Sequence, residues 1–181
     1  MKYTFTNKFS KDKEIAQVIF IEGTDMVART SDKRTVVEVG IGKREEMTRR
    51  KLITTIRKVV SLAKSTNKKK VTLNFFDFVF PHLHIPPSEL GEMLSANLEM
   101  ANFEFVKYKS KPKEGWGMLI EVVVVGKIGS VVERAIRKGK MVGEEINKTR
   151  TLANTPGGEM TPQKLAQAAI DAAAGLPVVV T

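Results

Sequence analysis

Two histidines are the first candidates for chemistry in this sequence of 181 residues. His82 and His84 are separated by one residue and stand between Pro81 and Pro86. In an extended backbone such a pair points both rings to the same side, so the geometry permits a shared metal ion. A metal site needs at least one further ligand, and the flanking prolines favour an exposed connection. We therefore predict no metal-ligating and no catalytic residue here.

Other kinds of chemistry are excluded by what the sequence lacks. It contains no cysteine, which rules out disulfides, zinc–thiolate sites, iron–sulfur clusters and cysteine nucleophiles. No serine stands in the context of a nucleophile elbow. Residues 40–44 (GIGKR) have neither the spacing of a Walker loop nor that of the dinucleotide fingerprint, so we interpret them as a strand-to-helix turn.

The composition is that of a globular protein. Hydrophobic residues make up 42% and charged residues 28% of the chain, enough to bury a real core. No apolar run approaches the 18 residues or so that cross a membrane, and the first residues lack the apolar core of a signal peptide. We therefore expect a cytoplasmic protein without membrane contact, consisting of one domain or one domain plus part of another.

Positive charge is concentrated in one segment. The formal net charge is +10, and residues 43–70 contain eleven lysines and arginines but only two acidic residues. Four of these cations are candidates for nucleic-acid contact: Arg49, Arg50, Arg57 and Lys58. The alternative is a solvated helix face, which is the usual role of such a charged surface.

Hydrophobic periodicity predicts the elements that would position these residues. Short apolar runs predict strands at about residues 17–21, 35–41, 70–76 and 118–125. Period-3.6 patterns predict helices at about 45–65, from 86–88 to near 102, 128–153 and 163–174, and residues 177–181 begin as a further strand. The alternation predicts an α/β fold with a mixed sheet. We expect residues 73–80 to form a strand that leaves this sheet, with their aromatic side chains in the hydrophobic core. The alternative is that these aromatic side chains stack on nucleic-acid bases.

Two glycines stand out in the third predicted helix. Gly139 and Gly143 are four residues apart on its apolar stripe, where the missing side chains would let another backbone approach closely. We interpret them as a tight packing site. The alternative is that both glycines are merely tolerated, at a cost of about 1 kcal/mol each relative to alanine.

Four segments, taken in order, resemble the leucyl aminopeptidase (cytosol aminopeptidase) family. They are residues 39–48 (VGIGKREEMT), 102–114 (NFEFVKYKSKPKE), 150–156 (RTLANTP) and 154–166 (NTPGGEMTPQKLA). The last is similar to the family's Asn-Thr-Pro-Pro-Asn-Asp-Leu-Thr-Pro signature at the start of the catalytic domain. Gly157 and Gly158 depart from it, since the family has Pro and Asn there.

The resemblance implies a domain organisation and a parent activity. It implies a macro-domain-like α/β domain with a mixed sheet flanked by helices at residues 1–126, a long interdomain helix at 127–153, and a truncated start of a catalytic metallopeptidase domain at 154–181. The residues expected to pack between domains are Gly139, Gly143, Asn154 and Pro156. The parent would be a homo-hexamer that removes N-terminal amino acids with two Zn or Mn ions in its catalytic domain.

This chain alone is expected to be a non-catalytic part of such an enzyme, serving assembly and active-site access. The family's metal-binding Asn-Thr-Asp-Ala-Glu-Gly-Arg stretch is missing from it. The alternative is a basic, macro-like module that binds nucleic acid, as some bacterial family members do. A third possibility is ADP-ribose binding by analogy with macro domains, but no acidic residue follows a Gly-rich phosphate loop to bind a ribose.

Overall fold

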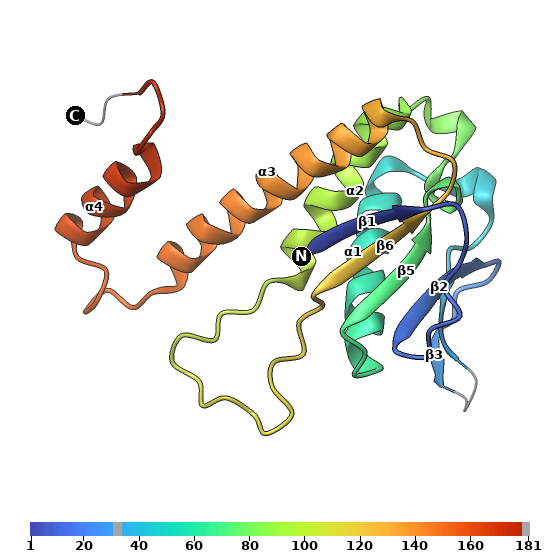
Figure 1. Cartoon of the computed structure of the whole chain (residues 1–181), viewed down its shortest axis with the longest axis horizontal. Helices are drawn as coiled ribbons and strands as arrows, with labels where there is room; N and C mark the ends of the chain where they lie inside the picture. The colour runs from blue at the N-terminus through green and yellow to red at the C-terminus, as the bar shows by residue number, and fades with distance from the viewer. Residues whose placement is uncertain (31–33, 179–181) are drawn as a thin grey trace.

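A six-stranded sheet forms the centre of the molecule (Figure 1). The computed structural model describes residues 1–30 and 34–178. The strands are β1 (Lys2–Thr6), β2 (Ile15–Ile21), β3 (Met26–Thr30), β4 (Thr35–Gly40), β5 (Lys70–Asn74) and β6 (Glu121–Val125). Their order across the sheet is β1-β6-β5-β2-β4-β3, and only β3 is antiparallel to its neighbour. The predicted α/β class with a mixed sheet is therefore confirmed.

Four α-helices accompany the sheet in the described part of the chain, close to the predicted positions. They are α1 (Arg49–Ser65), α2 (Pro87–Asn102), α3 (Ser130–Asn154) and α4 (Pro162–Ala173). The first begins four residues later than predicted, because the side chain of Thr48 caps it by accepting a hydrogen bond from the backbone N–H of Lys51. The preceding residues Arg44–Glu46 form a separate 3₁₀ turn, η1.

The helices α1 and α2 lie on one face of the sheet, behind the strands in Figure 1, and α3 packs along α2. The connections from β4 to β5 and from β5 to β6 both move across the sheet towards the β1 edge. Right-handed crossovers of this kind place their helices on the same side. The core lies between these two layers, with fully buried side chains such as Ile56, Leu73 and Leu94.

Close packing of α3 on α2 depends on the two glycines singled out above. A Cβ atom built on Gly139 would lie 2.1 Å from the carbonyl oxygen of Glu92, and one built on Gly143 would lie 2.5 Å from the Cβ of Glu99. The backbone of α2 therefore occupies the space that side chains at these two positions of α3 would need. A role for the two glycines between domains remains a prediction.

The aromatic segment after β5 differs from the predicted strand. Residues Phe75–Phe78 form a 3₁₀ turn, η2, because the side chain of Asn74 accepts a hydrogen bond from the backbone N–H of Phe76 and ends the strand. Phe75, Phe78 and Phe80 are nevertheless buried in the core, as expected, while Phe76 is half exposed. The strand predicted from residue 118 begins only at Glu121.

The C-terminal part of the described chain extends away from the sheet (Figure 1). The side chain of Thr161 caps α4 by accepting a hydrogen bond from the backbone N–H of Lys164, but no residue of α4 is buried. Of the strand predicted at residues 177–181, residues 177 and 178 have no strand conformation and 179–181 lie outside the described residues. Within the described residues, no helix is both long and apolar enough to cross a membrane.

Candidate functional site

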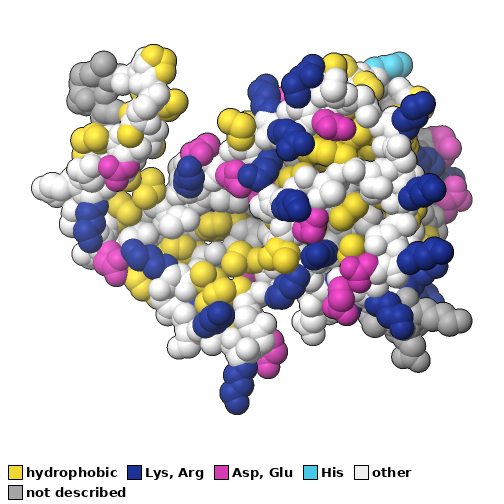
Figure 2. Space-filling view, viewed as in Figure 1, with side chains coloured by type: hydrophobic (Ala, Val, Ile, Leu, Met, Phe, Trp, Pro, Cys, Tyr) yellow, Lys and Arg dark blue, Asp and Glu magenta, His cyan; other side chains and the backbone are white. Residues whose placement is uncertain are grey.

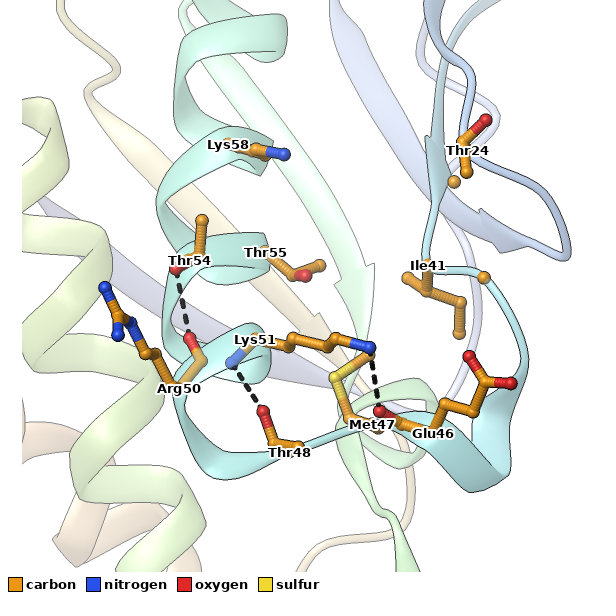
Figure 3. Close-up of a pocket in the computed structure, with 12 residues that line it drawn as sticks. Thr24, Ile41, Glu46, Met47, Thr48, Arg50, Lys51, Thr54, Thr55 and Lys58 are labelled. Carbon is orange, nitrogen blue, oxygen red and sulfur yellow. Dashed lines mark hydrogen bonds between the residues drawn. The ribbon is translucent and has the colours of Figure 1, made fainter.

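A cavity of about 600 Å³ opens beside the N-terminal half of α1 (Figure 3). Its walls come from four places: the turn after β2 (Thr24), the end of β4 and the turn after it (residues 40–42), the segment before α1 (residues 46–48) and α1 itself. Lys51, Thr55 and Lys58 face it from α1, because positions i, i+4 and i+7 lie on one side of a helix. The cavity is thus a groove between a cationic helix face and the carboxyl end of β4.

The four candidate nucleic-acid contacts do not share one environment. Arg49 forms an ion pair with Glu89, and the Nε of Arg57 donates a 2.9 Å hydrogen bond to Oδ1 of Asn97; both partners are on α2. Within residues 1–30 and 34–178, neither Arg50 nor Lys58 has a side-chain hydrogen bond or ion pair. Figure 3 shows Arg50 pointing away from the cavity.

The histidines are not arranged as a pair of metal ligands. His82 lies in the 3₁₀ turn η3 (Pro81–Leu83), and His84 has a left-handed backbone with φ of 50°, so the segment is not extended. The Nε2 of His82 is 2.8 Å from the carbonyl oxygen of Met47. The described part of the chain contains no group of three or more His, Asp or Glu side chains that fits a metal ion. The metals that the resemblance implies therefore do not fit these residues.

Large apolar side chains are exposed on both α3 and α4. On α3, Val131 and Met141 are 57% and 63% exposed; on α4, Leu165 and Ile170 are 52% and 50% exposed. Figure 2 shows hydrophobic side chains exposed on the part of the molecule that contains α4. Because a helix of 12 residues is marginal in water without tertiary packing, the exposed apolar side of α4 is suited to contact with another protein surface.

Two of the segments that carry the family resemblance meet in space. Lys107, from residues 102–114, donates a 2.7 Å hydrogen bond to Glu159, from residues 154–166. This hydrogen bond raises the pKa of Lys107 and lowers that of Glu159. Asn154 is exposed as the last residue of α3, and the carbonyl of Pro156 accepts hydrogen bonds from the next turn.

A buried ion pair lies where β1, α2 and α3 meet. The ammonium nitrogen of Met1 is 3.0 Å from Oε1 of Glu99. Burial raises the pKa of Glu99, and the hydrogen bond from the ammonium opposes this shift. Burial also raises the pKa of Tyr3, whose hydroxyl donates to the carbonyl of Ser95. These groups fasten the edge strand to the helices, and they are not part of the cavity beside α1.

Comparison with known structures defines the class of the fold. A mutant of tomato leucine aminopeptidase superposes with a TM-score of 0.77 at 13% identity, over 96% of this chain and 42% of that one. The bottromycin maturation enzyme BotP superposes with a TM-score of 0.65 at 18% identity, over 90% of this chain and 37% of that one. Another structure of BotP is described as a complex with Mn. The fold is that of the N-terminal α/β domain of leucine aminopeptidases.

Sequence comparison finds relatives of this chain among the cytosol aminopeptidases. It is 27% identical over 173 residues to a probable cytosol aminopeptidase of Chlamydia abortus, covering 96% of this chain and 33% of the relative. It is 29% identical over 140 residues to a probable cytosol aminopeptidase of Persephonella marina, covering 76% of this chain and 27% of the relative. No family model matches. The chain is homologous over most of its length to cytosol aminopeptidases, and it spans only about the N-terminal third of their length.

Proposed function

We propose that this chain is the non-catalytic N-terminal part of a leucyl aminopeptidase-type enzyme. Its partner is the catalytic domain of the same polypeptide, and its roles are assembly and control of access to the active site. The parent enzyme removes N-terminal amino acids from peptides with two Zn or Mn ions, as a homo-hexamer in the cytoplasm. The homology to the first third of enzymes named cytosol aminopeptidases supports this proposal.

The observation that carries the docking role is the unburied helix α4. Leu165, Ala169 and Ile170 form its apolar side, and Lys164, Gln167 and Asp171 form its polar side. An amphipathic helix buries its apolar side when a partner covers it. In this proposal residues 1–126 form the N-terminal domain, 127–153 the interdomain helix and 154–181 the first part of the catalytic domain. Gly139, Gly143, Asn154 and Pro156 then contribute to packing between domains.

The first test is the mass and activity of the natural gene product that carries this sequence. We expect a mass well above 20.1 kDa and metal-dependent hydrolysis of leucine p-nitroanilide, whereas the 181-residue chain hydrolyses none. A natural product of 20.1 kDa would contradict the proposal. It would favour the alternative of a nucleic-acid-binding module that uses Arg49, Arg50, Arg57 and Lys58.

A charge-matched pair of variants tests docking through α4. In the natural gene product, Leu165→Glu combined with Ile170→Glu should reduce both hexamer formation and peptidase activity at least about tenfold, because it places two carboxylates in an apolar interface. Light scattering and an activity assay measure the two effects. The control is Lys164→Glu, which changes the net charge by the same amount on the polar side of α4. Equal behaviour of the two proteins would disprove docking through this face.

A further inference from the structure

The hydroxyl of Thr55 is the unusual feature of the cavity beside α1. Thr55 is only 6% exposed, yet its hydroxyl has no hydrogen-bond partner among the described residues. The next residue behaves differently, since the hydroxyl of Thr54 donates a 3.0 Å hydrogen bond to the carbonyl of Arg50. Figure 3 shows the side chain of Thr55 directed into the cavity. No side-chain nitrogen or oxygen of the described residues is both buried and unpaired, so this hydroxyl is reached from the cavity and is available to something that enters it.

Two ammonium groups flank this hydroxyl. Lys51 precedes Thr55 by one helical turn, and Lys58 follows it by nearly one turn on the same side. Nζ of Lys51 donates one 3.1 Å hydrogen bond to the carbonyl of Glu46, which leaves two of its three N–H donors. Lys58 has no side-chain partner within residues 1–30 and 34–178.

One carboxylate also lines the cavity. Glu46 contributes its side chain, with Nζ of Lys43 3.9 Å away from Oε1. The balance of charge around the cavity is nevertheless positive, with Lys51 and Lys58 facing it and Lys43 beside Glu46. The rest of the wall includes the side chains of Ile41 and Met47, so the cationic region adjoins an apolar one.

We propose that this cavity binds a small organic phosphate, meaning a phosphate monoester whose apolar or aromatic group rests on Ile41. The phosphate accepts hydrogen bonds from the Thr55 hydroxyl and the ammonium groups of Lys51 and Lys58. A doubly charged anion with several acceptor oxygens suits two cations and one hydroxyl donor. The volume of about 600 Å³ lies within the range of small-molecule sites. This site is independent of docking through α4 and of the proposed aminopeptidase role.

The test is a titration of the 181-residue chain with phenyl phosphate, up to about 20 mM at low salt, in which the amide signals are observed by NMR. We expect saturable shifts at the amides of Gly42, Lys51 and Thr55, and weaker binding of inorganic phosphate, which lacks the apolar group. Thr55→Val keeps the shape of the side chain and should weaken binding about tenfold, while Thr55→Ser should retain binding because it keeps the hydroxyl. Lys58→Met should also weaken binding about tenfold.

Two matched controls separate the cavity from general charge. Thr54→Val removes a neighbouring hydroxyl that is already bonded to the carbonyl of Arg50, and Lys138→Met removes a positive charge from α3. Both should bind phenyl phosphate within about twofold of the parent chain. Equal affinity of Thr55→Val and Thr54→Val, or the lack of any saturable binding, would overturn the proposal. The proposal would also be overturned if the chain bound an oligonucleotide tightly, if Thr55→Val did not change that affinity, and if phenyl phosphate did not bind.

Discussion

Replacing Gly139 with alanine should lower the free energy of unfolding by about 2 kcal/mol. The added Cβ would lie 2.1 Å from the carbonyl oxygen of Glu92 and 2.2 Å from Oγ of Ser95, so α3 must move away from α2. Overpacking costs about 1–3 kcal/mol, and a clash this close with backbone atoms belongs at the upper end of that range. Subtracting the gain of about 1 kcal/mol in helix propensity leaves about 2 kcal/mol. Denaturant unfolding measures the difference, and thermal unfolding should show a midpoint lower by roughly 4–8 °C.

Gly157→Ala is the matched control for this prediction. A Cβ at Gly157 would have no other atom within 4 Å, so the same substitution should change stability by less than about 0.5 kcal/mol. Gly143→Ala should behave like Gly139→Ala, since its Cβ would lie 2.9 Å from the carbonyl oxygen of Ala96. If Gly139→Ala were as stable as Gly157→Ala, α2 and α3 would not approach as closely as described.

Replacing Asn102 with leucine should cost about 3 kcal/mol of stability. The buried Asn102 side chain donates a 2.8 Å hydrogen bond to the carbonyl of Leu119 and accepts one of 2.8 Å from its N–H. Leucine has the same branching of side-chain heavy atoms but leaves both backbone groups of Leu119 buried and unpaired, at about 1–3 kcal/mol each. Denaturant unfolding gives the total effect, and hydrogen exchange should show faster exchange of the Leu119 amide.

The control for Asn102 is Asn154→Leu, the same substitution at an exposed position. It should leave both the unfolding midpoint and the exchange of Leu119 unchanged in the 181-residue chain. Slow exchange at Leu119 in Asn102→Leu would mean that the segment between α2 and β6 is held by other contacts. The prediction would then be wrong.

Periodicity was a good guide wherever one face of an element is buried. The apolar positions of α1, among them Leu52, Ile56 and Val60, are all buried in the structure. The same holds for Leu90, Leu94 and Leu98 of α2. These spacings follow from a helix packed on a sheet, so they can be read from the sequence alone.

Short edge elements could not be predicted in the same way. The strand β3 has five residues and pairs only with β4, and β1 pairs only with β6, so neither has the extended apolar run of a central strand. The turn at Phe75–Phe78 depends on one side-chain cap from Asn74, which periodicity does not report. Local capping here prevails over the β-propensity of three phenylalanines.

The candidate sites required knowledge of distant contacts. The sequence marks Arg49 and Arg57 as free cations, whereas Glu89 and Asn97 of α2 pair with them in the fold. The cavity beside α1 was not predicted, although the spacing of Lys51, Thr55 and Lys58 was visible. The spacing does not show that Thr24 and Ile41 lie opposite α1 in the fold, where they form the other side of the groove.

The pairing of β1 with β6 has a consequence for synthesis on the ribosome. Lys2 pairs with Glu121, so β1 has no sheet partner until the chain has grown by more than a hundred residues. At about 5–20 residues per second this interval lasts roughly 6–24 s. During that time β2, β3, β4 and β5 can already pair with one another, because their partners lie close along the chain. The edge strand that is made first should therefore be the last strand to join the sheet.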